Sequence, residues 1–598
     1  MKYPSAIALI FSVLAIAAMA QIVEKQISIK DTDRYIIFPV KDSDPRVTAR
    51  ILSDGTSVDR FTFSLAVGEP DYWVFFDANS YRGKTLVVQL EGDAKKDLLE
   101  RVQAASSYPG QENVYKEKLR PQVLFSSQRG WINDPNGLIY YAGEYHMFYQ
   151  HNPFGWPHAN MHWGHAVSMD LVHWKELPPA LYIPEQGQAF SGTATVDPKN
   201  TAGFRRNGIN PLVAFYTRTG SGEHIALSYD KGRTFEEYSG NPVVKHTGRD
   251  PKVFWYEPGG HWVMALYDER PNARPMALAQ SAQVRGISIY TSPNLKEWTY
   301  RSTIDGFWEC PELFEIAVEG EPGVKKWVMY DADGEYIVGT FDGKEFKIEQ
   351  SFKQYDFGGG GNFYASQTFA NIPKEDGRRI QVGWLRNITT PGMPFNQSMG
   401  FPTELKLRKA FDGLRLTPTP VREISKLHGE SSVTKERLLN SGETVSSPVK
   451  SDTMHIIASF DPGDVRQFGL NINGYRFVYN RLESQIGPYN YVPPRWDDFK
   501  IEAIVDRINI QLFVNDGEMY FVVPYHSVDA EKVVEAFADA GFPGGGGRGA
   551  QPGGGRGIPP GGRGTAPPGM GPRNASKAIL KQFEVYALKS IWDPAREK

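Results

Sequence analysis

The chain has 598 residues, enough for about two to four domains. Its 66 basic and 69 acidic residues nearly cancel, which argues against a highly charged partner and therefore against nucleic acid. A single cysteine, Cys310, excludes an internal disulfide bond.

The first 20 residues have the features of a secretory signal peptide. Lys2 precedes an apolar run from Ala6 to Ala18, and Ala18-Met-Ala20 has the small residues of a cleavage site. A membrane anchor is the alternative, but the run is shorter than the roughly 20 residues that span a bilayer. No other stretch is apolar enough to do so. We therefore predict export, to the periplasm or the medium, with no transmembrane segment.

Residues 21–106 are predicted to form an accessory β module and a connector. Short runs such as Tyr35-Ile-Ile-Phe and Trp73-Val-Phe-Phe, separated by polar turns, are typical of strands. Residues 93–105 are predicted to form a connecting helix. The module contains no catalytic constellation, so we expect it to serve as a packing partner for the central domain.

Residues 115–420 repeat a β-rich unit. The phrase Trp-Ile-Asn-Asp-Pro-Asn-Gly at 131–137 would on its own suggest a surface turn, because its residues favour turns. Four later phrases, at 168–174, 228–235, 292–298 and 340–346, each run from a hydroxyl residue through a turn to an aromatic. This recurrence suggests hairpins of a repeated sheet.

The openings of the units recur as well, roughly 53 to 59 residues apart. They are Asp134, Ser191, Asp250, Glu309 and Asn362. Five units of about four strands each predict a five-bladed β-propeller, whose innermost strands line one channel. Equivalent positions should then converge, and three of the five are acidic.

Residues 430–598 are predicted to form a second β domain, a C-terminal β-sandwich. Asn515-Asp-Gly is a hairpin turn signal within it. Residues 541–573, rich in Gly, Pro and Arg, cannot bury a core and are predicted to be a disordered surface insertion. Contact of their Gly-Arg-Gly repeats with nucleic acid or acidic polymers is the alternative.

The three acidic positions suit glycoside hydrolysis with retention, which needs a carboxylate nucleophile and a carboxylic acid. Asp134, between two amides, is expected to be ionised. Trp308 and Cys310 should raise the pKa of Glu309 towards an acid/base role. Arg249 should keep Asp250 ionised. The alternatives are an ordinary Arg249–Asp250 ion pair and a structural Glu309.

Other chemistries find little support. The histidines at 158, 162, 165 and 173 match no zinc signature, and packing or sugar contacts explain them better. There is no phosphate-binding glycine loop, Ser-His-Asp set or dinucleotide fingerprint. We predict no metal and no cofactor.

Residues 131–137, Phe190-Ser-Gly, Arg249-Asp-Pro and Glu309-Cys resemble, in order and spacing, the motifs of glycoside hydrolase family 32, the β-fructosidases. The resemblance spans about 124–420 and extends to 505–513. It implies a five-bladed propeller with a C-terminal sandwich, and retaining hydrolysis of terminal fructofuranosides. The module before residue 110 resembles an accessory domain of some bacterial levanase-like members.

The resemblance also implies roles for individual residues: Asp134 as nucleophile, Glu309 as acid/base and Asp250 as transition-state stabiliser. It suggests as fructose-site residues Asn133, Gln150, Trp156, Phe190, Ser191, Arg249 and Asn362. Asn362 stands where the family usually has an aspartate. After Trp384 the chain reads Leu-Arg-Asn-Ile, without the tryptophan typical of invertases, which favours fructans over sucrose.

The sequence thus predicts an exported β-fructofuranosidase that releases terminal fructose from levan- or inulin-type fructans or fructo-oligosaccharides, with sucrose as a further substrate. A fructosyltransferase with the same triad, or a non-catalytic fructan-binding protein, are the alternatives. Linkage preference, endo or exo cleavage and oligomeric state stay open.

Overall fold

The computed structural model of the protein describes residues 22–92, 96–183, 185, 187–271, 283–352, 361–410, 412–487, 498–539 and 576–592. Strands dominate these residues, which confirms the all-β prediction. Their helical elements are short: α1 (Lys96–Leu99), η1 (Asn79–Tyr81), η2 (Gln111–Asn113), η3 (Glu257–Gly259) and η4 (Arg422–Leu427). The predicted signal peptide at 1–20 and the predicted insertion at 541–573 lie outside the described residues.

The chain divides into two compact units, 1–109 and 110–598. The first unit has a sheet in the order β1 (Ile22–Ser28), β6 (Thr85–Glu91), β3 (Arg46–Ser53), β4 (Thr56–Ser64). Its second sheet has the order β5 (Tyr72–Asp77), β2 (Tyr35–Val40), β7 (Gln103–Ala105). Phe38 of β2 contacts Phe61 and Phe63 of β4 edge to face, so the two sheets bury their inner faces against each other.

The predicted helix at 93–105 is wrong over most of its described length. Only Lys96–Leu99 is helical, and Gln103–Ala105 forms strand β7, antiparallel to the start of β2. The buried side chains of Leu99 and Val102 anchor the segment on either side of this change. Pairing with the open edge of β2 satisfies backbone groups on both strands, and that tertiary gain outweighs the local helical preference.

The second unit begins with five sheets that succeed one another along the chain. The first has the order β11 (Lys175–Leu181), β10 (His162–Ser168), β9 (Glu144–Asn152), β8 (Gly130–Tyr141), with the short β26 (Phe395–Asn396) beyond β8. The second is β12 (Ala189–Val196), β13 (Leu212–Arg218), β14 (Gly222–Ser228), β15 (Glu236–Glu237). The third is β16 (Arg249–Tyr256), β17 (His261–Pro271), β18 (Gln283–Ser292), β19 (Thr299–Asp305).

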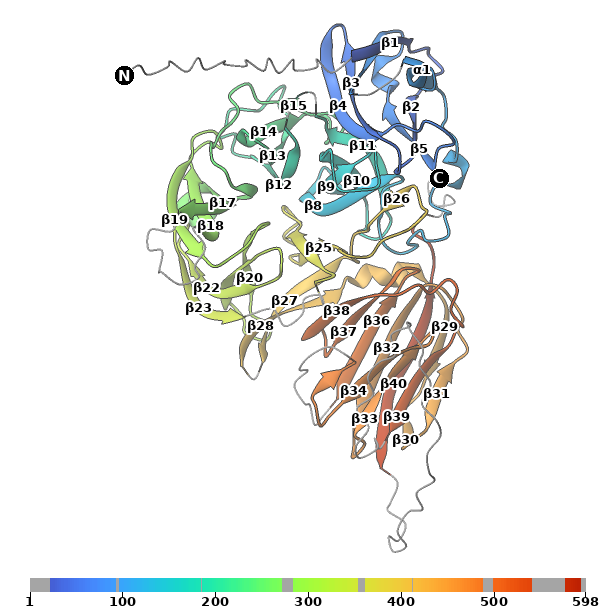
Figure 1. The fold of residues 1–598 in the computed structure, drawn as a ribbon. Coiled ribbons are helices and arrows are strands. Elements are labelled where there is room, and N and C mark those ends of the chain that lie inside the picture. The colour runs from blue at the N-terminus through green and yellow to red at the C-terminus, as the bar shows by residue number, and fades with distance from the viewer. Residues whose placement is uncertain are drawn as a thin grey trace, which may run out of the picture. The chain divides into compact units, whose positions relative to one another are not determined.

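The fourth sheet is β20 (Glu312–Ala317), β21 (Lys325–Tyr330), β22 (Tyr336–Phe341), β23 (Phe346–Phe352). The fifth is β24 (Tyr364–Thr368), β25 (Arg379–Trp384), β27 (Thr403–Ala410), β28 (Gly413–Pro420). Figure 1 shows these sheets arranged in succession around a common centre. The first strands lie closest to it, because β8, β12 and β16 contact in turn and β24 contacts β8.

Buried polar side chains of three of these first strands bond to one another. Lys252 of β16 donates from Nζ to Glu312 Oε1 (2.7 Å), and Thr368 Oγ1 of β24 donates to Glu312 Oε2 (2.6 Å). All three residues are buried. A buried charge needs such a partner, so this ion pair ties the third, fourth and fifth sheets together.

Two further sheets complete the second unit. The larger has the order β29 (His428–Thr434), β40 (Lys577–Leu588), β32 (Met454–Asp461), β36 (Phe499–Val505), β37 (Asn509–Val514), β38 (Met519–Pro524), and β30 (Arg437–Asn440) also pairs with β40. The smaller is β31 (Thr444–Ser447), β39 (Val534–Asp539), β33 (Gln467–Ile472), β34 (Tyr475–Asn480), β35 (Gln485–Ile486). One apolar core, which includes Phe460, Phe468 and Phe499, lies between them.

The hairpin β37–β38 connects these last sheets to the earlier ones. Phe513 and Tyr520 belong to the same buried cluster as Phe363 and Phe401, which flank the fifth sheet. Gln511 Oε1 accepts a hydrogen bond from the Phe401 amide (3.1 Å). One buried cluster therefore joins the first and fifth sheets to the hairpin β37–β38.

Across the described parts of the chain, no helix is long and apolar enough to cross a membrane. The same residues contain no group of three or more His, Cys, Asp or Glu side chains arranged to hold a metal ion. Of the four histidines named above, His165 stacks on His146 and Phe148, and His173 bonds to Asp170.

Candidate active site

Bulges at the starts of the first strands aim side chains towards the centre. The register of β8 shifts between Ile132 and Pro135, which brackets Asp134. Strands β12, β16 and β24 have a shift at the matching place, after Ala189, Arg249 and Tyr364. A bulge reorients a side chain without ending the strand. The turn-forming residues around Asp134 therefore lie in a bulged strand, β8, and not in the surface turn that the phrase suggests on its own.

Asp134 is surrounded by hydrogen-bond donors from three strand starts. Ser191 Oγ donates to Asp134 Oδ2 (2.7 Å), and Asn133 Nδ2 donates to Oδ1 (3.1 Å). The thiol of Cys310 lies 3.6 Å from Oδ2. Asn133 is itself held by Trp131, whose indole N–H donates to its Oδ1 (3.0 Å). These contacts fix the orientation of the carboxyl group.

Glu309 lies just before β20, between a cation and a phenol. Arg249 donates to Glu309 Oε2 from Nε (2.9 Å) and Nη2 (2.6 Å), and the Tyr364 hydroxyl donates to Oε1 (2.7 Å). Arg249 also lies over the rings of Tyr267 (4.6 Å) and Trp308 (5.5 Å). A two-point guanidinium contact restricts the carboxyl group far more than a lysine would.

Asp250 completes the cluster. Its Oδ2 accepts from the Cys310 amide (3.2 Å), with the Cys310 thiol at 3.5 Å and Arg249 Nε at 3.7 Å. Its own amide donates to Thr217 Oγ1 (2.9 Å). Its φ of 65° lies in the left-handed region, which non-glycine residues rarely adopt. The same segment thus presents Arg249 to Glu309 and Asp250 to Cys310.

The electrostatics differ from the sequence-based expectation. Burial, then the charge of Glu309, raises the pKa of Asp134 above its usual range, although Ser191 and Asn133 oppose the rise. Burial and the charges of Glu309 and Asp134 raise the pKa of Asp250 well above its usual range, despite Arg249. Both shifts run against the sequence-based expectation for these two groups, because burial outweighs the hydrogen-bond donors at Asp134 and the single guanidinium beside Asp250.

Aromatic rings surround the carboxyls. Trp131 and Trp384 meet edge to face with centroids 5.9 Å apart, and Trp384 meets Tyr364 in the same way (6.0 Å). On the other side Trp308 meets Tyr267 (5.1 Å). The three tryptophans are half-buried, and rings of this kind can offer an apolar face to a sugar.

The other predicted sugar-site residues divide into two groups. Gln150 is buried and donates to the Ala189 carbonyl (3.0 Å), and Trp156, which is half-buried, donates to the Phe395 carbonyl (3.1 Å). Phe190 precedes Ser191, and its carbonyl accepts from the Trp163 indole (3.0 Å). These contacts brace the strands around Asp134.

Asn362 makes contacts of another kind. Its Nδ2 donates to the Val522 carbonyl of β38 (3.0 Å), and its Oδ1 accepts from Asn387 (3.3 Å). The residue of this region that bonds to Glu309 is Tyr364, two residues later. Tyr364 was missed, although its place in the register of β24 matches that of Arg249 in β16.

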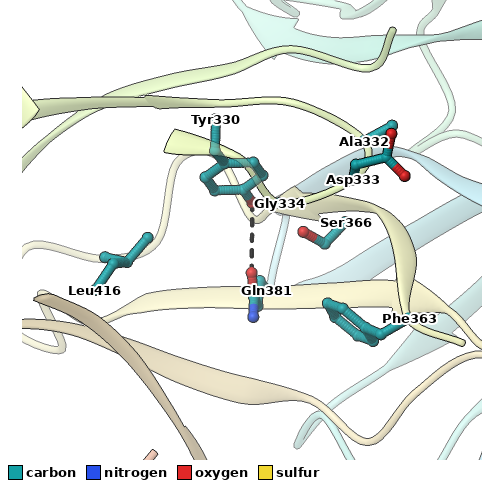
Figure 2. Close-up of a pocket in the computed structure, with 8 residues that line it drawn as sticks. All are labelled: Tyr330, Ala332, Asp333, Gly334, Phe363, Ser366, Gln381 and Leu416. Carbon is teal, nitrogen blue, oxygen red and sulfur yellow. Dashed lines mark hydrogen bonds between the residues drawn. The ribbon is translucent and has the colours of Figure 1, made fainter. Parts of the chain in front are cut away.

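A small pocket lies between the fourth and fifth sheets (Figure 2). It is lined by Tyr330, Ala332, Asp333, Gly334, Phe363, Ser366, Gln381 and Leu416. The Tyr330 hydroxyl donates to Gln381 Oε1 (3.4 Å) across it. It has room for about one water molecule, so it is too small for a sugar. Its Ala332 donates to the Glu309 carbonyl (2.8 Å), which makes the pocket part of the support behind Glu309.

Known proteins share the sequence and the fold. The model of the glycosyl hydrolases family 32 N-terminal domain matches residues 125–420. A levanase of Bacillus subtilis (strain 168) is 38% identical over 473 residues, which cover 69% of this chain and 67% of the relative. An extracellular exo-inulinase of Aspergillus niger is 30% identical over 494 residues, 68% of this chain and 89% of that protein.

A solved structure has a similar fold. The crystal structure of exo-inulinase from Aspergillus awamori has a TM-score of 0.64 and 24% identity, covering 80% of this chain and 100% of that one. The fold is thereby shared, and the sequence matches place the chain in one family. The protein therefore belongs to glycoside hydrolase family 32 and is a glycoside hydrolase that acts on β-fructosides.

Proposed function

We propose that the protein is an exported, retaining β-fructofuranosidase that releases terminal fructose from levan- or inulin-type fructans or fructo-oligosaccharides, with sucrose as a further substrate. The observation that carries this proposal is the carboxyl cluster. Asp134 and Asp250 both contact the Cys310 thiol, and Arg249 pairs with Glu309 and Asp250, so three carboxyls from the starts of β8, β16 and β20 lie together. Retaining hydrolysis needs a fixed nucleophile beside a group that delivers a proton.

Asp134 is proposed as the nucleophile. Its oxygens are oriented by Ser191 and Asn133, and a carboxylate aimed by such donors is held for attack on the anomeric carbon. Attack forms a bond from Asp134 to the fructosyl carbon while the bond to the leaving oxygen breaks. Asp250, held by the Cys310 amide, would hold sugar hydroxyls and stabilise the positive charge of the transition state.

Glu309 is proposed as the acid/base. It gives its proton to the leaving oxygen in the first step and takes one from water in the second, when water releases fructose from Asp134. Arg249 and Tyr364 keep its two oxygens in place between the steps.

We further propose the domain organisation that this function would use. The five sheets within 115–420 are interpreted as the blades of a five-bladed β-propeller, and 430–598 as a C-terminal β-sandwich. Residues 21–106 form an accessory module, and residues 1–20 direct export. The order of the sheets and the contacts between the first strands support the propeller assignment.

Two observations favour fructans as substrates. The relatives named above are a levanase and an exo-inulinase, the latter extracellular. Beside Trp384, Arg386 lies over the Tyr364 ring (4.0 Å) and donates to the Gly361 carbonyl (3.0 Å), at the edge of the carboxyl cluster. A planar guanidinium in that place offers both stacking and hydrogen bonds to a sugar beyond the first fructose.

The direct test is incubation of the purified protein with levan, inulin and sucrose in parallel, with products separated by chromatography. Free fructose as the main product from a fructan supports the proposal. Elongated oligosaccharides from sucrose would show a fructosyltransferase. Binding of levan without any product would show a fructan-binding protein, and either result would overturn the hydrolase proposal.

The roles are tested by Asp134→Asn and Glu309→Ala, each of which should lower kcat by about 10⁴-fold. Glu257→Ala is the matched control, because Glu257 is an exposed acid paired with Lys199. Near-wild-type fructose release by either of the first two variants would contradict the assigned roles.

A further inference from the structure

A buried carboxyl lies behind the Arg249–Asp250 segment and is not part of the reaction described above. Glu223 of β14 is fully buried and pairs directly with Thr217 of β13 in the sheet register. The partners of its carboxyl oxygens come from β13 and from the segment before β16, and not from Asp134 or Glu309. A buried acid among strands is costly unless its oxygens are used, so its partners indicate what it does.

Glu223 receives hydrogen bonds from two directions. Thr217 Oγ1 donates to both of its oxygens (2.9 and 3.1 Å), and His246 Nε2 lies 2.7 Å from Oε1. The Gly248 amide donates to His246 Nδ1 (2.7 Å), so the ring proton lies on Nε2 and is donated to Glu223. Backbone bonds between Glu223 and residues 243 and 244 bring the two segments together.

These bonds hold the short segment 244–250 along its length. Val244 bonds to Glu223 through the backbone, His246 bonds through its ring, and Gly248 bonds to that ring. At the far end the Asp250 amide donates to Thr217 Oγ1 (2.9 Å), the same hydroxyl that donates to Glu223. Both ends of the segment are therefore connected to Glu223: Val244 to its backbone amide, and Asp250 to its carboxyl group through Thr217.

The segment needs such support because its conformation is costly. Asp250 has a φ of 65°, and backbone strain of this kind persists only when surrounding contacts impose it. The segment must also deliver two side chains to two adjacent residues, Arg249 to Glu309 and Asp250 to Cys310. A small rotation about this point would shift both, and misplacement of about 1 Å can lower a rate about 100-fold.

We propose that Glu223 is a positioning residue that sets the Arg249–Asp250 segment through Thr217 and His246. This inference rests on the proposed function, since the segment matters for turnover only if Arg249 and Asp250 serve the reaction. Glu223 does not touch the substrate; it acts through the hydroxyl of Thr217 and the ring of His246.

The test compares Glu223→Gln, Thr217→Val and Thr217→Ser with the control Glu176→Gln. Glu176 is a partly buried acid of strand β11, in another sheet, and is bonded to Tyr115 and to the Gln128 amide. For each variant, kcat and KM are measured on the fructan that the wild type degrades, and folding is checked by thermal melting.

We expect Glu223→Gln and Thr217→Val to lower kcat about tenfold or more, with KM within about threefold of wild type. Thr217→Ser keeps the hydroxyl and should retain kcat within about threefold. Glu176→Gln should lower the melting temperature without this fall in kcat. Valine leaves the Asp250 amide without its acceptor, so it tests the connection even if Glu223→Gln fails to fold.

The inference is overturned if Thr217→Val keeps the wild-type kcat, or if Thr217→Ser loses as much as Thr217→Val. It is also overturned if a folded Glu223→Gln behaves like Glu176→Gln. In each of these cases the wild type still releases fructose, whereas a wild type that releases none would refute the proposed function itself.

Discussion

Asp331 should make the protein less stable as the pH rises, which is the opposite of what a salt-bridged acid does. Its side chain is 2% exposed. Its Oδ2 accepts from the Trp308 amide (2.9 Å) and its Oδ1 from the Glu335 amide (3.1 Å), directly behind Glu309. Burial raises its pKa from 3.8 to about 7; the Trp308 amide opposes the rise, and the charges of Asp333 and Glu335 add to it.

The size of the stability change follows from the two pKa values of Asp331, in the folded protein and in the unfolded chain. They differ by about 3 units, each worth about 1.4 kcal/mol. Between pH 3.8 and about 7 the folded protein binds this proton and the unfolded chain does not. The free energy of unfolding therefore falls with rising pH across that window, by up to about 4 kcal/mol, and is flat on either side.

Asp331→Asn isolates the effect, because asparagine does not titrate and all other groups are shared with the wild type. Asparagine offers only one oxygen to the two amides, so the variant should be less stable at pH 4.5 by about 1 kcal/mol. At pH 8 this difference should be reversed, with the variant more stable by about 2 kcal/mol, because the wild type loses about 3 kcal/mol between pH 4.5 and 7. Calorimetric melting of both proteins from pH 4 to 8 measures the change.

The control is Asp376→Asn, since Arg378 lowers the pKa of Asp376 and reverses the sign. There the wild type should gain stability over the variant as the pH rises through the acid range. If the melting temperatures of wild type and Asp331→Asn run parallel from pH 4 to 8, Asp331 does not bind the additional proton and the reasoning is refuted.

Three further predictions concern the centre of the second unit. Lys252→Met should destabilise the protein by about 3–5 kcal/mol in melting experiments, because it leaves Glu312 buried without its cation, and adding Glu312→Gln should restore part of the loss. Tyr364→Phe should lower kcat/KM about 10- to 100-fold without loss of folding, because it removes a hydrogen bond to a carboxyl worth about 1.5–3 kcal/mol. Asp250→Asn should abolish turnover and raise the melting temperature at pH 7 more than at pH 4. The reason is that the raised pKa of Asp250 makes its ionised form costly in the folded protein. A variant that melts below the wild type at pH 7 would contradict this.

The strand content could be predicted because alternation of apolar and polar residues is a local property. The meeting of Asp134, Asp250 and Glu309 could be predicted from repetition, since equivalent points of repeated sheets lie close together. The contacts through Cys310 bring these residues together as expected. By contrast, strand β7 depends on an open edge of β2 that lies far away in the sequence, so a local pattern suggested a helix.

Charge states were harder to anticipate than positions. Neighbours in sequence suggested that Arg249 serves Asp250, but its closest contact is Glu309, at 2.6 Å against 3.7 Å. A bulged strand turns successive side chains in different directions, so adjacency along the chain does not decide pairing. Once the guanidinium is committed to Glu309, burial dominates at Asp250 and its pKa rises.

The fifth sheet shows that the register of strand pairing locates a site residue better than the spacing of sequence motifs does. Spacing along the chain selected Asn362, but the ladder between β24 and β25 begins at Tyr364, as the ladder between β16 and β17 begins at Arg249. In both β16 and β24, the residue at this first paired position is the one that bonds to Glu309: Arg249 and Tyr364. Asn362, two residues earlier, meets the carbonyl of Val522 instead. The short segment 362–364 thus contacts both the carboxyl cluster, through Tyr364, and the C-terminal sheets, through Asn362. An aspartate at 362 would place its charge against a carbonyl oxygen, which explains why an amide suits that position.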